Sequence, residues 1–265
     1  MGDEIIASGQ ARLMQQSNPN KVFIYAQPGG AIREHEMWRN NPRIGTRAER
    51  PYQPQILVNG PGFRPYIAAK SERQWSWKEF ECTPGEIYFS EDETRAAHAH
   101  RPLLVIEPNN KAKASPNKDW GRARWQELVR LLRAAGIRPV QLGGAGTQLL
   151  QGVEHIDTPT FRHACAVLAK ARAAVLPEGG LHHAAAALGV PAVVLFGGFI
   201  SPKQTGYASQ VSLFTGGKPC GMRILCKHCA DAMAKITPAD VFAEVAKLLQ
   251  PQTTTADSQP GVALP

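Results

Sequence analysis

Between Leu103 and Phe196 the sequence alternates short apolar runs with segments of helical periodicity, and this alternation restricts the fold more than any other feature. The apolar runs are residues 103–107, 139–142, 153–156, 173–176 and 192–196. Apolar residues three and four positions apart predict helices around Trp125 and over 161–169 and 181–188. Such alternation is typical of right-handed βαβ units and predicts a parallel sheet covered by helices on both faces.

The carboxyl ends of these runs carry glycines and polar residues, in the segments IEPNNK, LGG, LPEGG and FGG. Parallel sheets bind their ligands at the carboxyl ends of the strands, so we expect the binding site at this edge. A last helix is predicted from Thr237, its N-cap, and Pro238, its first residue, because apolar residues follow at helical spacing as far as Leu249.

The first hundred residues differ in composition and in hydrophobic pattern. They are rich in Pro, Gly, Trp and Arg and show no long helical repeat between residues 20 and 90, which favours a small, irregular α/β unit. Ser90 followed by Glu93 is a capping box and predicts a short helix to about His98. Short strands are predicted at 22–25, 56–58 and 86–89.

This difference in composition and pattern predicts two domains. We expect an N-terminal unit over residues 1–100 and a parallel-sheet domain over residues 101–250. The polar, Pro- and Thr-rich segment 251–265 is expected to be a disordered tail.

The composition excludes several classes of protein. With 43% hydrophobic and 20% charged residues among 265, a packed core is expected, and a disordered or collagen-like chain is excluded. No window reaches the roughly 18 apolar residues of a membrane-spanning helix, and the first residues do not resemble a signal peptide. Five cysteines are too few for a secreted disulfide framework, so we expect a cytoplasmic protein.

The net charge of +8 is unevenly distributed. Residues 1–100 hold 12 basic and 12 acidic side chains, whereas the remainder holds 18 and 10. Between Lys111 and Arg138 the excess reaches +6, with Lys113 and Lys118 among the contributors. A local excess of this kind indicates a small anionic ligand at least as well as it indicates a nucleic-acid surface.

The segment from Pro177 to Gly198 contains a candidate anion site. Gly179 and Gly180 permit a tight turn from a strand into a helix, whose free N–H groups face the binding edge. His183 in the first turn is placed to donate to a phosphate, and Glu178 to accept from sugar hydroxyls. The alternative is an ordinary strand-to-helix turn in which these side chains are solvated or packed.

This segment resembles the C-terminal signature of glycosyltransferase family 9, the heptosyltransferase family. The pattern is an acidic residue, two small residues, a histidine, an Ala-rich helix and a Gly-x-Pro turn into a strand ending in Phe-Gly. Glu178, Gly179, Gly180, His183 and Pro191 occupy its positions. The family usually has Asp where this chain has Glu178, whose side chain is one methylene longer.

Two further segments resemble the donor domain of the same family. Asn117 to Trp120 resembles a Lys-x-Trp stretch in which the lysine, here Lys118, contacts the donor phosphates; the alternative is a solvated charge beside a core tryptophan. Gly143 and Gly144 resemble a Gly-rich strand end near the nucleotide base.

Gly2, Asp3 and Glu4 resemble the family's Gly-Asp motif, in which the aspartate is the general base. A sugar hydroxyl is a weak nucleophile, and a positioned carboxylate assists it by removing its proton. The alternative is that Asp3 is the N-cap of a helix. The family has a strand before this motif and this chain has only Met1, so the resemblance implies a reduced N-terminal sheet.

Together the resemblance implies a GT-B-like protein with a Rossmann-like donor domain and a reduced acceptor-side unit. The implied reaction moves a hexose or heptose from a nucleotide-diphosphate sugar to a saccharide or other hydroxyl acceptor, with inversion and without a required metal. The alternatives are a non-catalytic nucleotide-sugar binder and a transferase acting on nucleic acid. Segments 38–43, 59–62 and 75–77 are not explained by the resemblance and belong either to an acceptor cleft or to the core.

Cys220, Cys226, His228 and Cys229 form a C-x5-C-x-H-C pattern. Three thiolates and an imidazole suffice for tetrahedral zinc, although structural zinc sites normally draw on two separated pairs of ligands. We expect that no cofactor is required, and a zinc site is the alternative. Cys82 and Cys165 are interpreted as core residues.

Overall fold

A six-stranded parallel sheet forms the centre of the computed structural model, which describes residues 1–49, 53–109 and 116–250. The strand order is β10-β9-β8-β5-β6-β7, and every neighbouring pair is parallel. The predicted parallel sheet is therefore confirmed, with β10 as a strand that the sequence pattern did not indicate. The strands are β5 (Leu104–Ile106), β6 (Pro139–Gly143), β7 (Glu154–Asp157), β8 (Ala173–Pro177), β9 (Ala192–Phe196) and β10 (Val211–Phe214).

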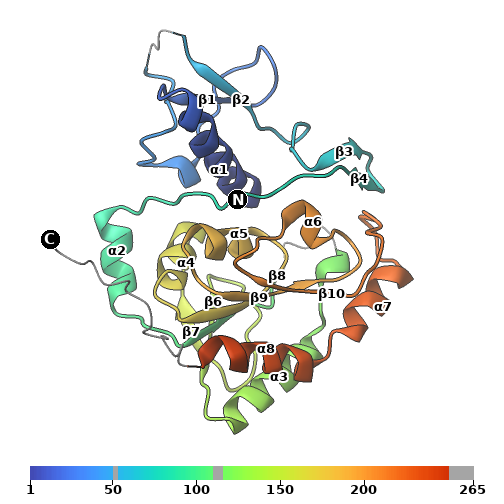
Figure 1. The fold of residues 1–265 in the computed structure, drawn as a ribbon. Coiled ribbons are helices and arrows are strands. Elements are labelled where there is room, and N and C mark those ends of the chain that lie inside the picture. The colour runs from blue at the N-terminus through green and yellow to red at the C-terminus, as the bar shows by residue number, and fades with distance from the viewer. Residues whose placement is uncertain (50–52, 110–115, 251–265) are drawn as a thin grey trace, which may run out of the picture.

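Helices cover both faces of this sheet (Figure 1). α3 (Arg122–Ala134) and α8 (Pro238–Leu249) pack on one face, and α4 (Phe161–Leu168) and α5 (Gly180–Ala187) pack on the other. Successive side chains of a strand point to opposite faces, so Val193 faces α3 and α8 whereas Val194 faces α4 and α5. α6 (Pro202–Thr205) and α7 (Lys227–Lys235) follow in the loops on either side of β10.

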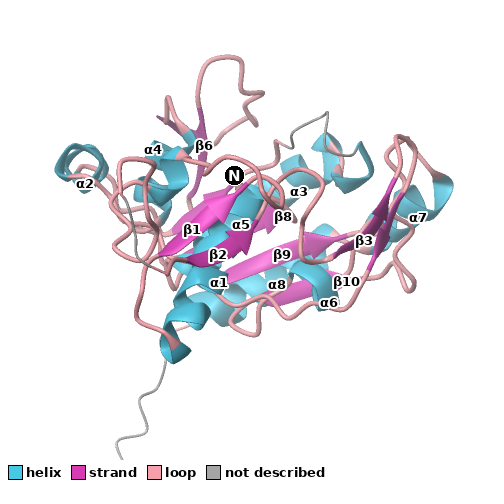
Figure 2. Ribbon diagram, turned by 90° about the horizontal axis from the view of Figure 1, so that it is seen from above, coloured by secondary structure: helices cyan, strands magenta, loops and turns pink. Residues whose placement is uncertain are grey.

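The N-terminal unit has only small sheets (Figure 2). α1 and η1, a 3-10 helix, accompany a parallel pair, β1 and β2, and an antiparallel hairpin, β3 and β4. The sheet is thus reduced, and the strand predictions at 22–25 and 56–58 are confirmed. The elements are α1 (Gly2–Ser17), β1 (Val22–Tyr25), η1 (Glu36–Trp38), β2 (Gln55–Val58), β3 (Ile67–Lys70) and β4 (Trp75–Trp77).

The strand predicted at 86–89 is wrong, because side chains rather than a neighbouring strand satisfy its backbone. The Glu86 N–H donates to the Ser8 hydroxyl at 2.8 Å, and the Glu86 carbonyl accepts from that hydroxyl at 3.2 Å. The Tyr88 carbonyl accepts from Arg162 at 2.6 Å. The segment is therefore an extended connection between the two parts of the molecule.

The predicted capping box at Ser90 and the predicted N-cap at Thr237 are both present. Ser90 and Glu93 exchange hydrogen bonds at the start of α2 (Glu91–His98), and Thr237 caps α8 in the same way with Asp240. Glu93 has a second role, since its carboxylate also pairs with the buried Arg162 on α4 at 2.6 Å. Local capping and a tertiary contact thus use the same side chain.

α1 stands with its first turn against the first turn of α5 (Figure 1). A Cβ atom at Gly2 would lie 2.6 Å from Cδ2 of His183, so only a glycine permits this approach. Ile5 and Ile6 continue the same core as Ala184 on α5. Asp3 lies inside the helix after Met1, so its interpretation as an N-cap is wrong.

Among the described residues, no helix combines the length and the apolar character needed to span a membrane. The prediction of a disordered tail concerns residues 251–265, which lie outside the described residues.

Candidate active site

His182 shapes the turn between β8 and α5. Its Nδ1 accepts from the Gly179 N–H at 2.8 Å, and its Nε2 lies 2.8 Å from the Thr205 carbonyl, which only accepts. These two partners fix one neutral tautomer, and burial lowers the pKa of the ring, which favours the neutral form. Sequence reasoning missed this residue; its signal was its place three residues after Gly179.

His183 is buried beneath α1 and is 3% exposed. Its Nδ1 lies 2.7 Å from the Tyr207 hydroxyl, and Gly2 covers the edge of the ring that carries Cδ2 and Nε2. Burial lowers the pKa of His183 well below its usual value, so the ring is neutral. The structure thus places His183 under the junction of the two helices, and its contact with a donor phosphate stays a prediction.

Lys118 and Glu178 form an ion pair at the carboxyl edge of the sheet. Lys118 ends η2 (Pro116–Lys118), and its ammonium also lies 5.1 Å from the centre of the Phe199 ring. Burial raises the pKa of Glu178, but polar interactions with Lys118, His182 and Thr205 together outweigh it, and the pKa falls below its usual value. The Glu178 carboxylate is therefore ionised beside the first turn of α5.

Asp3 is held by two donors. Its Oδ1 accepts from the Tyr66 hydroxyl at 2.5 Å, and its Oδ2 lies 2.9 Å from Nε of Arg64. Tyr66 is buried, which raises its pKa well above the usual value, and the charges of Asp3 and Glu178 both add to this shift. The charges of both carboxylates thus act on one phenol, although the two residues lie far apart in the sequence.

A cleft of about 710 Å³ opens where β5 and β6 end. Its lining includes Asn109 after β5, residues 145–148 after Gly143 and Gly144, and Pro116 beside Lys118. Glu107 lies at the same edge, where burial raises the pKa of its carboxyl to about 7 against the hydrogen bonds from Asn109. The cleft and Lys118 are therefore neighbours along one edge.

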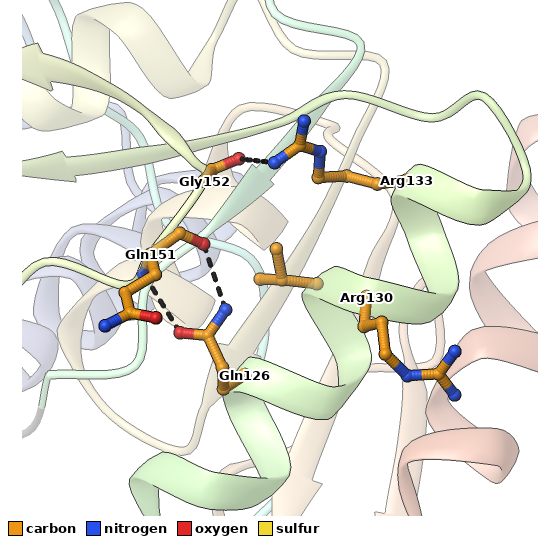
Figure 3. Close-up of a pocket in the computed structure, with 6 residues that line it drawn as sticks. Gln126, Arg130, Arg133, Gln151 and Gly152 are labelled. Carbon is orange, nitrogen blue, oxygen red and sulfur yellow. Dashed lines mark hydrogen bonds between the residues drawn. The ribbon is translucent and has the colours of Figure 1, made fainter.

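A second pocket, of about 360 Å³, lies beside α3 and is lined by residues of α3 and of the turn before β7 (Figure 3). Gln126 exchanges two hydrogen bonds of 2.9 Å with the backbone of Gln151, and Arg133 donates to the Gly152 carbonyl at 3.1 Å. These bonds connect α3 to the turn before β7. The pocket lies at the amino end of β7, away from the candidate donor site.

Most described cations of the basic stretch have internal partners. Arg122 and Arg124 donate to the carbonyls of Leu149 and Trp120, and Arg130 pairs with Glu127. Lys111 and Lys113 lie outside the described residues. The charge excess at this edge thus serves partly to connect α3 to its surroundings.

Cys220, Cys226, His228 and Cys229 also gather in space, between β10 and the start of α7. Their four potential ligand atoms all lie within 4.8 Å of one another. This Cys/His cluster contains none of Asp3, Lys118 and Glu178.

Comparison with known proteins agrees with this architecture. The model for glycosyltransferase family 9 (heptosyltransferase) matches residues 68–220. A family 9 glycosyltransferase structure from Veillonella parvula DSM 2008 is 13% identical with a TM-score of 0.60, and the match covers 94% of each chain. No curated protein matches.

Two further structures match over part of their length. ADP-heptose lps heptosyltransferase II of E. coli is 23% identical, with a TM-score of 0.49 over 64% of this chain and 54% of that one. The iron-containing dodecameric glycosyltransferase TibC from enterotoxigenic E. coli H10407 is 16% identical, with a TM-score of 0.46 over 66% and 49%.

The chain therefore spans about half the length of these two E. coli transferases. The fold is α/β and GT-B-like, with a Rossmann-like parallel sheet and a reduced N-terminal unit. With a family model matched over more than half of its residues, the chain belongs to glycosyltransferase family 9, the heptosyltransferase family.

Proposed function

We propose that this chain transfers a hexose or heptose from a nucleotide-diphosphate sugar to an acceptor hydroxyl. Family membership supports the reaction class, and the packing of the α1 turn that holds Asp3 against the α5 turn that follows Glu178 supports the assignment of roles. In this proposal residues 1–100 form the acceptor side and residues 101–250 the donor side.

Asp3 is the general base of the proposed reaction. The acceptor oxygen attacks the anomeric carbon while its proton passes to the Asp3 carboxylate, and the bond from that carbon to the diphosphate breaks. The electron pair leaves with the nucleoside diphosphate, and attack opposite to it inverts the anomeric centre. Arg64 and Tyr66 keep the carboxylate in one orientation for this transfer.

The donor side stabilises the charge that develops on the diphosphate. Lys118 supplies an ammonium and the first turn of α5, which begins at Gly180, supplies backbone N–H groups, so the step needs no catalytic metal. In the proposed complex Lys118 contacts the phosphates, and Glu178 contacts the sugar hydroxyls. The neighbouring cleft beyond Gly143 and Gly144 takes the nucleoside.

The observation that carries the proposal is the junction of α1 and α5. The contact of Gly2 with His183 places the turn that contains Asp3 over the turn that contains Gly180. A base and an anion-binding helix start are thus brought together from segments more than one hundred residues apart.

Donor binding is measured first, by thermal shift with ADP, GDP, UDP, CDP and dTDP. Transfer is then assayed with the matching nucleotide sugars and no added divalent cation. We expect Asp3→Asn to reduce transfer by at least about a hundredfold, because it removes the proton acceptor, while the dissociation constant for the nucleoside diphosphate changes by less than about threefold.

Asp92→Asn is the matched control, because Asp92 is an exposed carboxylate on α2. Loss of nucleotide binding in Asp3→Asn, with normal turnover of bound donor, would contradict the role of Asp3. Binding by the wild type without any transfer or donor hydrolysis would identify a nucleotide-sugar binding protein instead. A duplex affinity that falls steeply with salt would favour a nucleic-acid acceptor.

A further inference from the structure

The Cys/His cluster has the geometry of a ligand shell. The Sγ atom of Cys220 lies 3.7 Å from that of Cys226 and 3.2 Å from that of Cys229, and His228 Nδ1 lies 3.9 Å from the Cys229 sulfur. A tetrahedron of thiolates about 2.3 Å from a metal has edges of about 3.8 Å. A disulfide would require about 2.05 Å between two sulfurs, so these are contacts between free thiols.

The imidazole is already oriented for a metal. His228 Nε2 lies 2.8 Å from the Gly216 carbonyl, which only accepts, so Nε2 carries the hydrogen and Nδ1 presents its lone pair to the thiols. A backbone carbonyl on the second ring nitrogen is the usual support of a metal-binding histidine. A Cβ atom at Gly198 would lie 2.6 Å from Nδ1, so the glycine leaves room for the ring in this position.

We propose that Cys220, Cys226, His228 and Cys229 bind one zinc ion tetrahedrally. Three thiolates and one imidazole nitrogen fill all four positions, and a site without an open position is structural rather than catalytic. The proposed zinc is therefore compatible with a transfer step that uses no metal, and it does not depend on that reaction.

The segment between the first two ligands is attached to the donor side. The Asn117 side chain donates to the carbonyls of Met222 and Ile224 at 2.6 and 2.7 Å and accepts from the Cys226 N–H at 3.1 Å. Asn117 directly precedes Lys118. Zinc therefore fixes the loop that positions the lysine of the candidate donor site.

The same segment is attached to the β3–β4 hairpin of the N-terminal unit, which lies on the same side of the molecule as α7 in both ribbon views (Figures 1 and 2). Gln74 donates to the Cys220 carbonyl at 2.8 Å, and the N–H groups of Trp75 and Arg223 donate to Gly221 and Arg73 at 2.9 Å. Gly221 has a φ of +64°, and a Cβ atom there would lie 1.8 Å from the Trp75 carbonyl oxygen. The loop from Cys220 to Cys226, the zinc loop, thus joins the two parts of the protein.

Metal content tests the site itself. We expect the full chain, purified without added metal or chelator, to contain one zinc ion per molecule, measured by inductively coupled plasma mass spectrometry. Cys226→Ser and His228→Gln should lose at least about nine tenths of the zinc, whereas Cys82→Ser, which changes a cysteine outside the cluster, should retain it. A wild type with stoichiometric iron, with a Cys220–Cys229 disulfide, or with no bound metal would overturn the proposal.

Limited proteolysis of the wild type tests the role of the loop without relying on a variant that folds. A mercurial reagent titrates the thiols while a chromogenic chelator reports the released zinc, and trypsin is then added. We expect cleavage after Arg223 and Arg73 to accelerate at least about tenfold on release, because both sites are held by the zinc loop. Cleavage after Arg95 on α2 is the control and should change by less than about twofold. Unchanged cleavage after Arg223 would overturn the structural role, and unchanged cleavage after Arg73 would overturn the connection to the hairpin.

Discussion

A central strand of the large sheet and the second strand of the small parallel pair are buried to very different extents. Every residue of β9 is buried, whereas none of β2 is. β9 lies between two other strands and two layers of helices, while β2 is one member of a two-stranded sheet. The N-terminal unit therefore has too little sheet of its own to form a separate core, and contacts with the other part must hold it in place.

These contacts combine a shared apolar core with specific hydrogen bonds. Arg162 on α4 is 1% exposed and donates to the Glu93 carboxylate and to the carbonyls of Glu36 and Tyr88. Trp77 on β4 donates to the Phe199 carbonyl at 3.1 Å. Apolar burial thus specifies the central sheet, whereas a shared apolar core and buried polar contacts together hold the N-terminal unit on it.

Arg162→Met gives the largest expected loss of stability. It leaves the Glu93 carboxylate buried without its charge partner and two carbonyls without their donor, which costs about 3–5 kcal/mol. Urea denaturation measures the change. Arg95→Met, which removes an exposed partner of Asp92, should change the free energy of unfolding by less than about 0.5 kcal/mol. Equal effects of the two substitutions would show that the buried pair does not anchor the N-terminal unit.

Matched Leu-to-Ala substitutions test the comparison of the two sheets directly. Leu195 on β9 is fully buried, so Leu195→Ala should reduce the free energy of unfolding by about 3 kcal/mol. Leu57 on β2 is only partly buried, and Leu57→Ala should cost about 1 kcal/mol. Chemical denaturation of both variants measures the two losses in the free energy of unfolding. A cost at Leu57 as large as that at Leu195 would mean that the small sheet carries its own core.

Glu107→Gln tests a smaller effect, at the binding edge of the large sheet. The pKa of Glu107 is raised to about 7, so the native state favours its protonated form and stability falls as the pH rises from about 4.5 to about 7. A neutral amide keeps an oxygen for the Asn109 hydrogen bonds and removes this loss. We expect a gain on the order of 2 kcal/mol at pH 8 and almost none at pH 4.5, measured by thermal unfolding at both values. A gain that is equal at the two pH values would show that Glu107 is not the titrating group.

The sequence predicted the central sheet well because its signals are local. Thr237 and Pro238 predict the start of α8, because an N-cap threonine and a proline at the first position both favour a helix start. The runs that form β8 and β9 are continuous and apolar. The segment 86–89 shows the limit of this reasoning, since extended residues form a strand only if a neighbouring strand accepts their hydrogen bonds. There Ser8 and Arg162 supply the partners instead.

In the candidate site, too, some features were predictable from local sequence and others depend on tertiary contacts. The order of Glu178, Gly179 and Gly180 after an apolar run was enough to indicate a helix start at the binding edge. The sequence did not indicate that His182 would hold that turn, because the role depends on Thr205 lying beneath the ring.

By itself the sequence determined the alternation of strands and helices, the edge at which ligands are expected and the family motif, because periodicity, capping and turn chemistry act over a few residues. Only the tertiary structure decided that the turn holding Asp3 packs against the start of α5, that His183 is buried under Gly2 and that the potential ligand atoms of four Cys and His side chains gather within 4.8 Å of one another. These relations depend on distances between segments that chain connectivity leaves free, and packing of α1 and of the β10–α7 loop on the sheet domain sets them.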